Sequence, residues 1–512
     1  MNYIRFRIVF GSIRCFMQPG RNHCVGLRPN LLCGFQPVSR IVLIYKERGI
    51  SLKNNDKQIS QIKDRFLKLI NVVLVMIPFA IYDSFVLGAS QFAGRDRIYV
   101  WMQALLFMLV YSLATRTYDA FYIKYSKISE LIYSQVLSVL VADALMFVVI
   151  WILLRQFPPF LLALLTLTVQ ILLIVIWVYL VHQWYFKTNP PLKTAVIWDQ
   201  RKDFLELIDS YGLNKRFEVI QDSNVEDCIH DLSILDSVEV VFMCGVRSHE
   251  RNIIMKACIA NDTPVFMIPR IGDVIMSGAM NMHMFHLPVL RVARYDPSPE
   301  YLFTKRLLDL VISGIGIVIT SPIMLVTAIA IKVTDGGPVF YKQTRLTKDG
   351  QLFQVLKFRS MRVDAEKDGV ARLSTGENDD RITLVGRIIR SCRVDELPQL
   401  INILKGEMSV VGPRPERPEI AEQYVAELPE FNLRLQAKCG LTGYAQVYGK
   451  YNTTPYDKLQ MDLMYLAKPS IAQDLEIMMA TVKILFMPES TEGVAEGAPT
   501  AMNQENNDKT AV

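Results

Sequence analysis

The hydrophobic pattern of the chain begins with four long apolar runs. They occupy residues 66–88, 98–115, 131–154 and 160–186. Each reaches or nearly reaches the ~20 residues that a helix needs to cross ~30 Å of hydrocarbon. The pattern therefore predicts a membrane α-helical bundle of four transmembrane helices within residues 61–187.

Basic residues flank these runs unequally. They gather before the first run, between the second and third, and after the fourth: Lys63, Arg65, Lys68, Arg116, Lys124, Lys127, Lys187 and Lys193. Because such residues favour the cytoplasmic side, we expect both ends of the bundle there. Two acidic residues, Asp83 and Asp143, lie within the runs and should face the bundle interior, as a structural pair or as a functional relay.

Residues 188–295 change to short β-rich strings alternating with amphipathic stretches. The strings begin at Thr194, Phe217, Val238 and Pro264, which predicts a small Rossmann-like parallel α/β module. A dinucleotide site would need GxGxxG after the first strand, but Trp198-Asp-Gln-Arg-Lys follows instead. We expect a packing, dimerising or regulatory module, and with it a homodimer.

A fifth apolar segment, residues 305–332, opens the last ordered unit. Ser321-Pro322 lies in its middle, where proline removes a helical hydrogen bond. Lys305 and Arg306 precede the run and Lys332 follows it. Basic flanks on both sides predict a re-entrant helix that bends at Ser321-Pro322 and returns to the cytoplasmic face. The alternative is a fifth span with a proline kink.

The two ends of the chain lack such patterns. Residues 1–60 are basic and show no sustained periodicity, so we predict a poorly ordered extension. Residues 488–512 are polar, small and acidic, which is typical of a disordered tail.

Composition supports a membrane protein. Apolar residues make up 51% of the 512 residues, the mean hydropathy is +0.23, and the excess is concentrated in the apolar runs. A net charge of +6 gives no signal of nucleic-acid binding. The eight cysteines form no CxxC, so the sequence does not predict a zinc site.

Candidate chemistry is concentrated in residues 390–400 and 412–418. Asp395 and Glu396 are adjacent carboxylates that follow Arg390, while Arg414 and Arg417 lie in a proline-rich loop. Carboxylates hold divalent metals or attack electrophiles, and arginines bind phosphate oxygens in pairs. Pro398 favours a helix start nearby, so the carboxylates should lie near a helix N-terminus. An ordinary N-terminal capping cluster is the alternative.

Several strings in residues 301–487 resemble one known family. They are Lys305-Arg306 with Asp309, Ser321-Pro322, Gly337-Pro338, Gln343-Thr-Arg345, Lys357-Phe-Arg-Ser-Met361, Asp395-Glu-Leu-Pro-Gln-Leu400 and Gly412-Pro-Arg-Pro415. In this order they resemble the catalytic domain of the bacterial sugar transferases, monotopic polyprenyl-phosphate hexose-1-phosphate transferases with an α+β fold. The preceding spans and α/β module resemble the long-form members.

The resemblance implies an enzyme in the bacterial inner membrane, with its catalytic domain on the cytoplasmic face. Such enzymes transfer a hexose-1-phosphate from a UDP-sugar to undecaprenyl phosphate, release UMP and use Mg²⁺. This is the first membrane step of exopolysaccharide, capsule or O-antigen assembly. By resemblance, Asp395 is the nucleophile that forms a covalent phosphosugar, and Glu396 holds Mg²⁺ with help from Asp395.

The resemblance also assigns supporting roles. Arg390 and Arg414 would bind phosphate, with Arg417 beside them. Lys357 and Arg359 would complete the phosphate cradle, and Gln446 would contact the nucleotide. Lys305, Arg306 and Asp309 would anchor the entrance of the re-entrant helix or contact the lipid phosphate.

Two rival interpretations stay open at this level. The chain could be a non-catalytic membrane scaffold or regulator acting through residues 188–295, although a scaffold has little use for the acidic pair and its arginines. Alternatively, Asp395 and Glu396 could both bind metal, with no covalent step.

Overall fold

The computed structural model describes residues 50–88, 96–199, 204–210, 212–362, 381–449 and 453–485. The predicted disordered tail lies outside these residues, as does the N-terminal extension up to residue 49. The first helix begins at Ile50, so its opening turns occupy the last part of the predicted extension.

Four helices cover the four predicted spans. They are α2 (Ile50–Gly88), α3 (Asp96–Thr117), α4 (Ile128–Leu154) and α5 (Phe160–Thr188). Together with a later helix, α10, the described part of the chain holds five helices long and apolar enough to cross a membrane. Large apolar side chains such as Ile81, Leu105 and Leu161 are exposed on their surfaces, as expected where lipid is the solvent.

A parallel sheet forms the centre of the α/β module. Its strand order is β2-β1-β3-β4, with β1 (Leu192–Trp198), β2 (Phe217–Asn224), β3 (Val240–Cys244) and β4 (Val265–Ile268). All three strand pairings are parallel, which confirms the predicted α/β class. The four strands lie at the four predicted strings.

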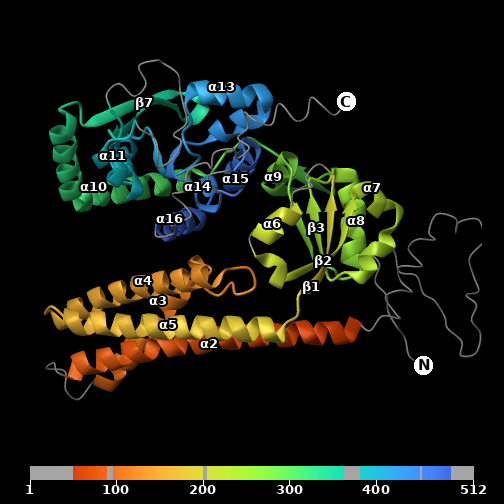
Figure 1. Ribbon diagram of the computed structural model, residues 1–512, viewed down its shortest axis with the longest axis horizontal. Helices are drawn as coiled ribbons and strands as arrows, with labels where there is room; N and C mark the ends of the chain where they lie inside the picture. The colour runs from red at the N-terminus through yellow and green to blue at the C-terminus, as the bar shows by residue number, and fades with distance from the viewer. Residues whose placement is uncertain are drawn as a thin grey trace, which may run out of the picture. The chain divides into compact units, whose positions relative to one another are not determined.

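Alternate residues of β1 face opposite sides of the sheet. Ala195 and Ile197 join a core with α7 (Val225–His230) and α8 (Ser248–Ala260). Val196 joins a second core with α6 (Phe204–Ser210). Because both faces are covered, β1 is apolar from Ala195 to Trp198, and Figure 1 shows α6 and the α7–α8 pair on opposite sides of the sheet. Short elements lie between and after these strands: η2 (Leu213–Lys215), η3 (Leu232–Ser237), α9 (Ile271–Ser277) and the antiparallel pair β5 (Met280–Met284) and β6 (Leu287–Arg291). Val274 of α9 is buried in the core of the C-terminal domain.

Helix α10 (Pro299–Asp335) is continuous through Pro322. Pro322 has no amide to offer the carbonyl of Val318, and the Ser321 hydroxyl donates to that carbonyl at 2.8 Å instead. The helix changes direction along its length (Figure 1), as proline kinks do. The structure thus has a bent helix rather than a broken one, and the re-entrant path stays a prediction.

The C-terminal domain follows α10. Its strands are the antiparallel pair β7 (Phe340–Leu346) and β8 (Leu352–Phe358) and the parallel pair β9 (Ser409–Val411) and β10 (Gly440–Thr442). Its helices are η4 (Lys348–Gly350), α11 (Leu384–Ser391), η5 (Val394–Glu396), α12 (Gln399–Lys405), α13 (Pro418–Glu427), η6 (Pro429–Gln436), α14 (Tyr444–Tyr448), α15 (Pro455–Ala467) and α16 (Ile471–Leu485).

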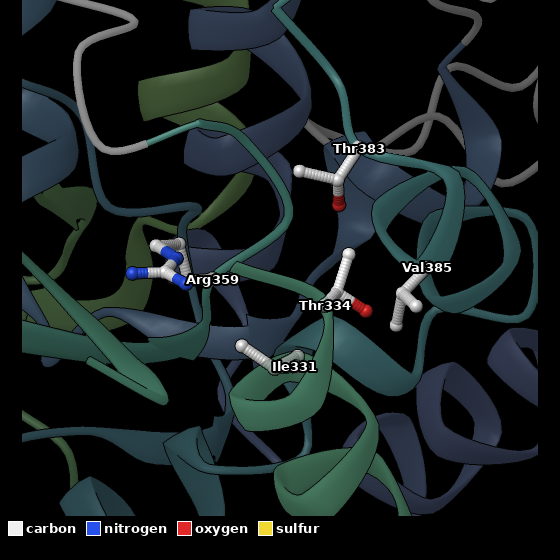
Figure 2. A pocket seen from close by; sticks show the side chains of 5 residues that line it. All are labelled: Ile331, Thr334, Arg359, Thr383 and Val385. Carbon is white, nitrogen blue, oxygen red and sulfur yellow. The ribbon is translucent and has the colours of Figure 1, made fainter. Parts of the chain in front are cut away.

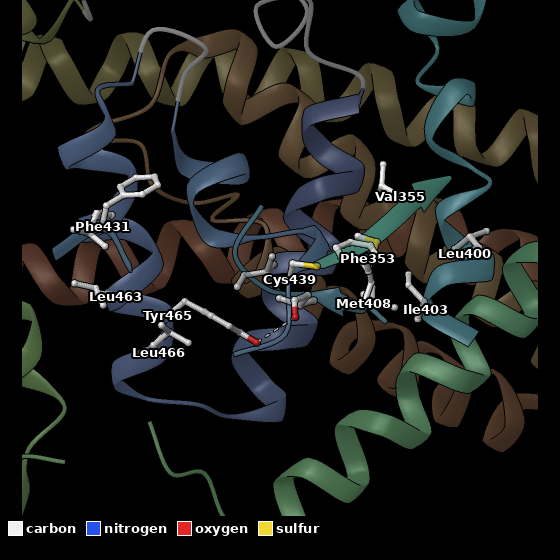
Figure 3. Close-up of a cluster of buried hydrophobic side chains, with 14 of the residues drawn as sticks. Phe353, Val355, Leu400, Ile403, Met408, Phe431, Cys439, Leu463, Tyr465 and Leu466 are labelled. Carbon is white, nitrogen blue, oxygen red and sulfur yellow. Dashed lines mark hydrogen bonds between the residues drawn. The ribbon is translucent and has the colours of Figure 1, made fainter. Parts of the chain in front are cut away.

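One apolar core holds these short elements together. Val355 of β8, Ile403 of α12 and Leu463 of α15 are buried in it (Figure 3). Val411 of β9 is buried in the same core. Burying an aliphatic side chain of this size stabilises a fold by about 1.5–3 kcal/mol. The core therefore fixes β8, α12 and β9, and the loops that follow them, relative to one another.

Candidate active site

The two adjacent carboxylates lie in the turn between α11 and α12. Asp395 and Glu396 belong to η5, and Arg393 before them has a left-handed backbone with φ 52°. This conformation is costly for a non-glycine residue and reverses the chain sharply. Pro398 occupies the N-cap position of α12, so the acidic pair lies just before a helix N-terminus, as the sequence predicted.

Glu396 is held by two cations from distant parts of the chain. Lys357 of β8 donates to its Oε1 at 3.0 Å, and Arg414 of the Pro-Arg-Pro loop donates to the same oxygen at 3.2 Å. Burial alone would raise the pKa of Glu396, but these two cations outweigh it and hold that pKa well below its usual range. Glu396 is therefore a carboxylate at any physiological pH.

The pKa of Asp395 moves in the opposite direction. Burial raises it first and the charge of Glu396 raises it further, while Lys357, Arg390 and Arg414 oppose both. Two neighbouring carboxylates with diverging pKa values are typical of sites that give each a separate chemical role. A raised pKa also makes the ionised Asp395 a stronger base and nucleophile than an ordinary carboxylate.

A small, solvent-open pocket lies beside Glu396. Its lining comes from five segments and consists of Arg345, Val355, Lys357, Glu396, Gln399, Arg414, Pro415, Gly440, Leu441 and Gln446. The Oε1 of Gln446 is buried there without a hydrogen-bond partner. An unpaired buried acceptor is costly, so the pocket favours a ligand that donates a hydrogen bond to it.

Positive charge dominates the pocket wall. Burial lowers the pKa of Arg345 to about 10, and the nearby charges of Arg414 and Arg417 act in the same direction, against Glu416. The side chain of Arg414 is 43% exposed, which leaves part of its guanidinium facing solvent. A cluster of guanidinium and ammonium groups in a partly buried pocket suits phosphate oxygens.

Hydrogen bonds from two arginine side chains hold the backbone of the loop that carries Arg414. Arg434, whose side chain is only 3% exposed, donates to Asp462 at 2.8 Å and to the backbone carbonyl of Arg414 at 3.0 Å. Arg345 donates to the carbonyl of Pro415 at 2.9 Å. These bonds form a clamp, defined here as Arg345, Arg434 and Asp462, that sets the position of Arg414.

At Gly412 and Gly440 the backbone of the same loop lies very close to a neighbouring segment. A Cβ on Gly440 would lie 2.1 Å from the amide nitrogen of Gly412, which no side chain tolerates. The close approach lets Gly412 donate to Thr442 at 2.9 Å and Gly440 donate to Pro413 at 3.0 Å. Backbone hydrogen bonds and the clamp therefore hold the loop on both sides.

Asp395 and Glu396 supply part of the ligand set that a divalent cation needs. Among the described residues no group of three His, Cys, Asp or Glu side chains is arranged for a metal. Asp395 and Glu396 supply two hard oxygen donors, and Mg²⁺ commonly takes one or two carboxylates and completes its shell with water and substrate phosphates. The residues present therefore fit Mg²⁺ held jointly with a phosphorylated substrate.

The other predicted site residues fall into two groups. Arg390 acts electrostatically on Asp395 and donates to Ser360 at 2.8 Å, so it lies at the site. Arg417 occupies the N-cap position of α13, and its charge acts on Arg345. Arg359, by contrast, lies with Ile331 and Thr334 of α10 at a separate pocket (Figure 2), and the expected pairing of Arg359 with Lys357 in one cradle is not found.

The three residues at the entrance of α10 bind within the domain. Lys305 pairs with Asp474 at 2.9 Å, and Arg306 donates to the carbonyls of Ile403 and Leu404 at the end of α12. Asp309 accepts from the amide of Val410 at 2.8 Å. These contacts match the anchoring alternative.

Sequence reasoning gave no role to Arg345, Gln399, Arg434 and Asp462. Arg345 lies in a strand interleaved with cations, which was a visible signal. The clamp pair of Arg434 and Asp462 is separated by 28 residues, and no local pattern connects them.

Comparison with known proteins identifies the family of residues 300–488. The family described as bacterial sugar transferase matches residues 300–488. A UDP-glucose:undecaprenyl-phosphate glucose-1-phosphate transferase of Caulobacter vibrioides is 40% identical over 191 residues, which cover 36% of this chain and 71% of the relative.

Two further relatives extend the comparison. A UDP-N-acetylgalactosamine-undecaprenyl-phosphate N-acetylgalactosaminephosphotransferase of Aeromonas hydrophila is 36% identical over 232 residues, or 45% of this chain and 54% of the relative. A UDP-glucose:undecaprenyl-phosphate glucose-1-phosphate transferase of Xanthomonas campestris pv. campestris is 30% identical over 320 residues, or 60% and 62%. The matched part of the chain thus spans about half the length of the Aeromonas relative.

Proposed function

Because this chain belongs to the bacterial sugar transferase family, we propose that it transfers a hexose-1-phosphate from a UDP-sugar to undecaprenyl phosphate. The products would be UMP and an undecaprenyl-diphospho-sugar. The observation that carries the proposal is the Asp395–Glu396 pair, placed against Lys357 and Arg414 at the edge of a positively charged pocket.

In the first step, an oxygen of Asp395 attacks the β-phosphorus of the UDP-sugar. The bond from that phosphorus to the bridging oxygen breaks, and UMP leaves with the electron pair. Asp395 then carries the sugar phosphate as an acyl phosphate. The raised pKa of Asp395 supports its role as the nucleophile, and the low pKa of Glu396 supports a permanent negative charge beside it.

In the second step, a phosphate oxygen of the lipid attacks the same phosphorus. The acyl phosphate bond breaks and the carboxylate of Asp395 is restored, so atoms and charge balance over the cycle. Lys357, Arg390 and Arg414 stabilise charge on the phosphoryl oxygens in both steps. The clamp contributes by keeping Arg414 in place.

Asp395 and Glu396 would hold Mg²⁺ together with the substrate phosphates. The ion would supply charge neutralisation on the pyrophosphate when bound. Gln446 would accept a hydrogen bond from the uracil or the sugar through its otherwise unpaired Oε1.

For the membrane, we propose that α2 to α5 span the bacterial inner membrane and that α10 enters and returns on the cytoplasmic face. The apolar side chains of α10, such as Val318, Ile319 and Val326, are 67–73% exposed. Its first half is tied to β9 through Asp309 and its second half packs on α11 through Ile331. Contacts of both halves with one small domain favour a bent helix over a straight crossing.

The test is UMP release by purified full-length protein. With Mg²⁺ and undecaprenyl phosphate, we expect release from one member of a panel of UDP-glucose, UDP-galactose and UDP-N-acetylgalactosamine. Release should disappear in Asp395→Asn and in Glu396→Gln. No release from any UDP-sugar would contradict the enzyme and favour the scaffold.

A trapping experiment separates the covalent route from a purely metal-binding one. Without acceptor lipid, wild-type protein should retain a label from the β-phosphate of the donor, and Asp395→Asn should not. If the wild type forms product with lipid yet traps no label, Asp395 is a metal ligand and not the nucleophile.

A further inference from the structure

Asn402 is a buried polar residue of α12 to which the proposed reaction gives no role. Its side chain belongs to a residue that is only 1% exposed. The Oδ1 accepts from the amide of Leu356 at 3.0 Å. The Nδ2 donates to the carbonyl of Gln354 at 2.8 Å and to the side chain of Glu407 at 2.6 Å. Both donor hydrogens of the carboxamide are therefore used inside the domain, as a buried amide requires.

Two of these bonds lie on the free edge of strand β8. β7 and β8 form a two-stranded sheet, so β8 has a second edge open to other partners. Gln354 and Leu356 flank Val355, and the Asn402 carboxamide bonds the carbonyl of the first and the amide of the second. A peptide group of a neighbouring strand would bind these same kinds of group. Asn402 thus joins α12 to β8 through the backbone.

This junction lies one residue before Lys357. Side chains alternate along a strand, so Lys357 is on the same face of β8 as Phe353 and Val355, which are buried in the core shared with α12. A shift of one residue would turn Lys357 to the opposite face. The two bonds from Asn402 specify one position of β8 along α12 and so fix the face on which Lys357 lies.

The same helix follows the partner of Lys357. Glu396 lies just before the N-terminus of α12, which has only seven residues, and its Oε1 accepts from Lys357 at 3.0 Å. Arg306 of α10 holds the other end of α12 through the carbonyls of Ile403 and Leu404. Asn402 therefore connects the helix that follows Glu396 to the strand that carries Lys357.

We propose that Asn402 is a positioning residue of the transfer reaction and acts through Lys357. By holding β8 against α12, it keeps the ammonium group of Lys357 at Glu396. The inference rests on the proposed function, in which Lys357 stabilises charge on the phosphoryl oxygens. Misplacing such a group by ~1 Å can lower a rate by up to ~10²-fold.

A double-mutant cycle separates this role from a general effect on stability. Asn402→Ala should lower the kcat of UMP formation ~10-fold, with the KM for the UDP-sugar within ~2-fold of the wild type. In a Lys357→Met background no ammonium group remains to be placed, so Asn402→Ala should lower kcat by less than ~2-fold. Equal losses of kcat in the two backgrounds would overturn the proposal.

Tyr301→Phe is the matched control. Tyr301 is 7% exposed, and its hydroxyl donates to Asp474 at 3.0 Å, so this variant also removes a buried hydrogen bond from the domain. Its effect on kcat should be the same with and without Lys357. If the control were as non-additive as Asn402→Ala, any destabilisation would give the same result and the assignment would fail.

Thermal midpoints of the same four proteins of the cycle give a measurement that needs no substrate. Lys357→Met should lower the midpoint more in the wild type than in Asn402→Ala, because only the wild type holds Lys357 at Glu396. Additive midpoint changes would overturn the proposal. An inactive wild type would contradict the proposed function alone, and the midpoints would still decide the role of Asn402.

Asn402→Asp takes the place of Asn402→Ala in both measurements if the alanine variant does not fold. It keeps the shape of the side chain and the acceptor for Leu356, and as a carboxylate it loses the donor to Gln354. The same non-additivity with Lys357→Met is expected, and additive changes in kcat and midpoint would again overturn the proposal.

Discussion

Two pairs of acidic residues in this chain lie in contrasting surroundings. Asp395 and Glu396 lie among cations that the protein itself supplies, with Lys357 and Arg414 on one oxygen of Glu396. Asp83 and Asp143 lie in an apolar bundle with tyrosine and glutamine near them, and residues 69–88, 98–115, 131–154 and 160–186 contain no lysine or arginine.

The difference shows where a phosphate group can bind. At the first pair, Lys357, Arg390 and Arg414 lie close to the carboxylates, so an anionic phosphate can be added at low electrostatic cost. At the second pair the surroundings are apolar and supply no lysine or arginine, so an anionic phosphate would be strongly disfavoured there.

The largest loss of activity is expected for Asp395→Asn. Removing the nucleophile should lower UMP formation by at least ~10³-fold. Stability should change little, because burial already disfavours the ionised aspartate. UMP release and thermal unfolding measure the two effects, and Cys392→Ser, an exposed neighbour, is the control. Retention of most activity would remove the nucleophile assignment.

Breaking the clamp should also have a large effect. Arg434→Met leaves Asp462 buried without its partner, and loss of one member of a buried ion pair costs about 3–5 kcal/mol. The thermal midpoint should fall by several degrees, and UMP release should fall with it because Arg414 is no longer positioned. The double variant Arg434→Met with Asp462→Asn should recover part of the midpoint. An additive loss in the double variant would show that the two side chains act independently.

Lys357→Met tests the link between charge and reactivity. The positive charge of Lys357 lowers the pKa of Asp395, so its removal should raise that pKa. Because Asp395 must be ionised to attack, activity is present above its pKa and lost below it. The acid limb of kcat/KM should therefore move to higher pH, and the plateau should fall ~10- to 100-fold. A lower plateau with an unmoved acid limb would mean that Lys357 binds substrate without affecting Asp395.

The smallest effect is expected for Gln446→Leu. Losing one neutral hydrogen bond to the donor substrate costs about 0.5–1.5 kcal/mol, or roughly a 2- to 10-fold rise in KM. The kcat should stay near the wild-type value, since Gln446 is not expected to contact the reacting phosphorus. Initial rates across UDP-sugar concentrations separate the two constants. A fall in kcat with an unchanged KM would place Gln446 at the chemistry.

Local patterns in the sequence determined much of this molecule. The four apolar runs correspond to α2 to α5, and the β-rich strings correspond to β1 to β4. Helical and strand periodicity are properties of neighbouring residues, so the sequence alone reveals them. The acidic pair and its flanking arginines were equally visible, since their chemistry is carried by a short continuous segment.

Only the tertiary structure decided which distant side chains meet. Packing of β8 against α12 brings Lys357 to Glu396, across 39 residues, yet places Arg359 at another pocket. The clamp that holds Arg414 likewise depends on the register between separate elements. That register is set by the fit of buried side chains over the whole core, a long-range property that no local pattern in the chain encodes.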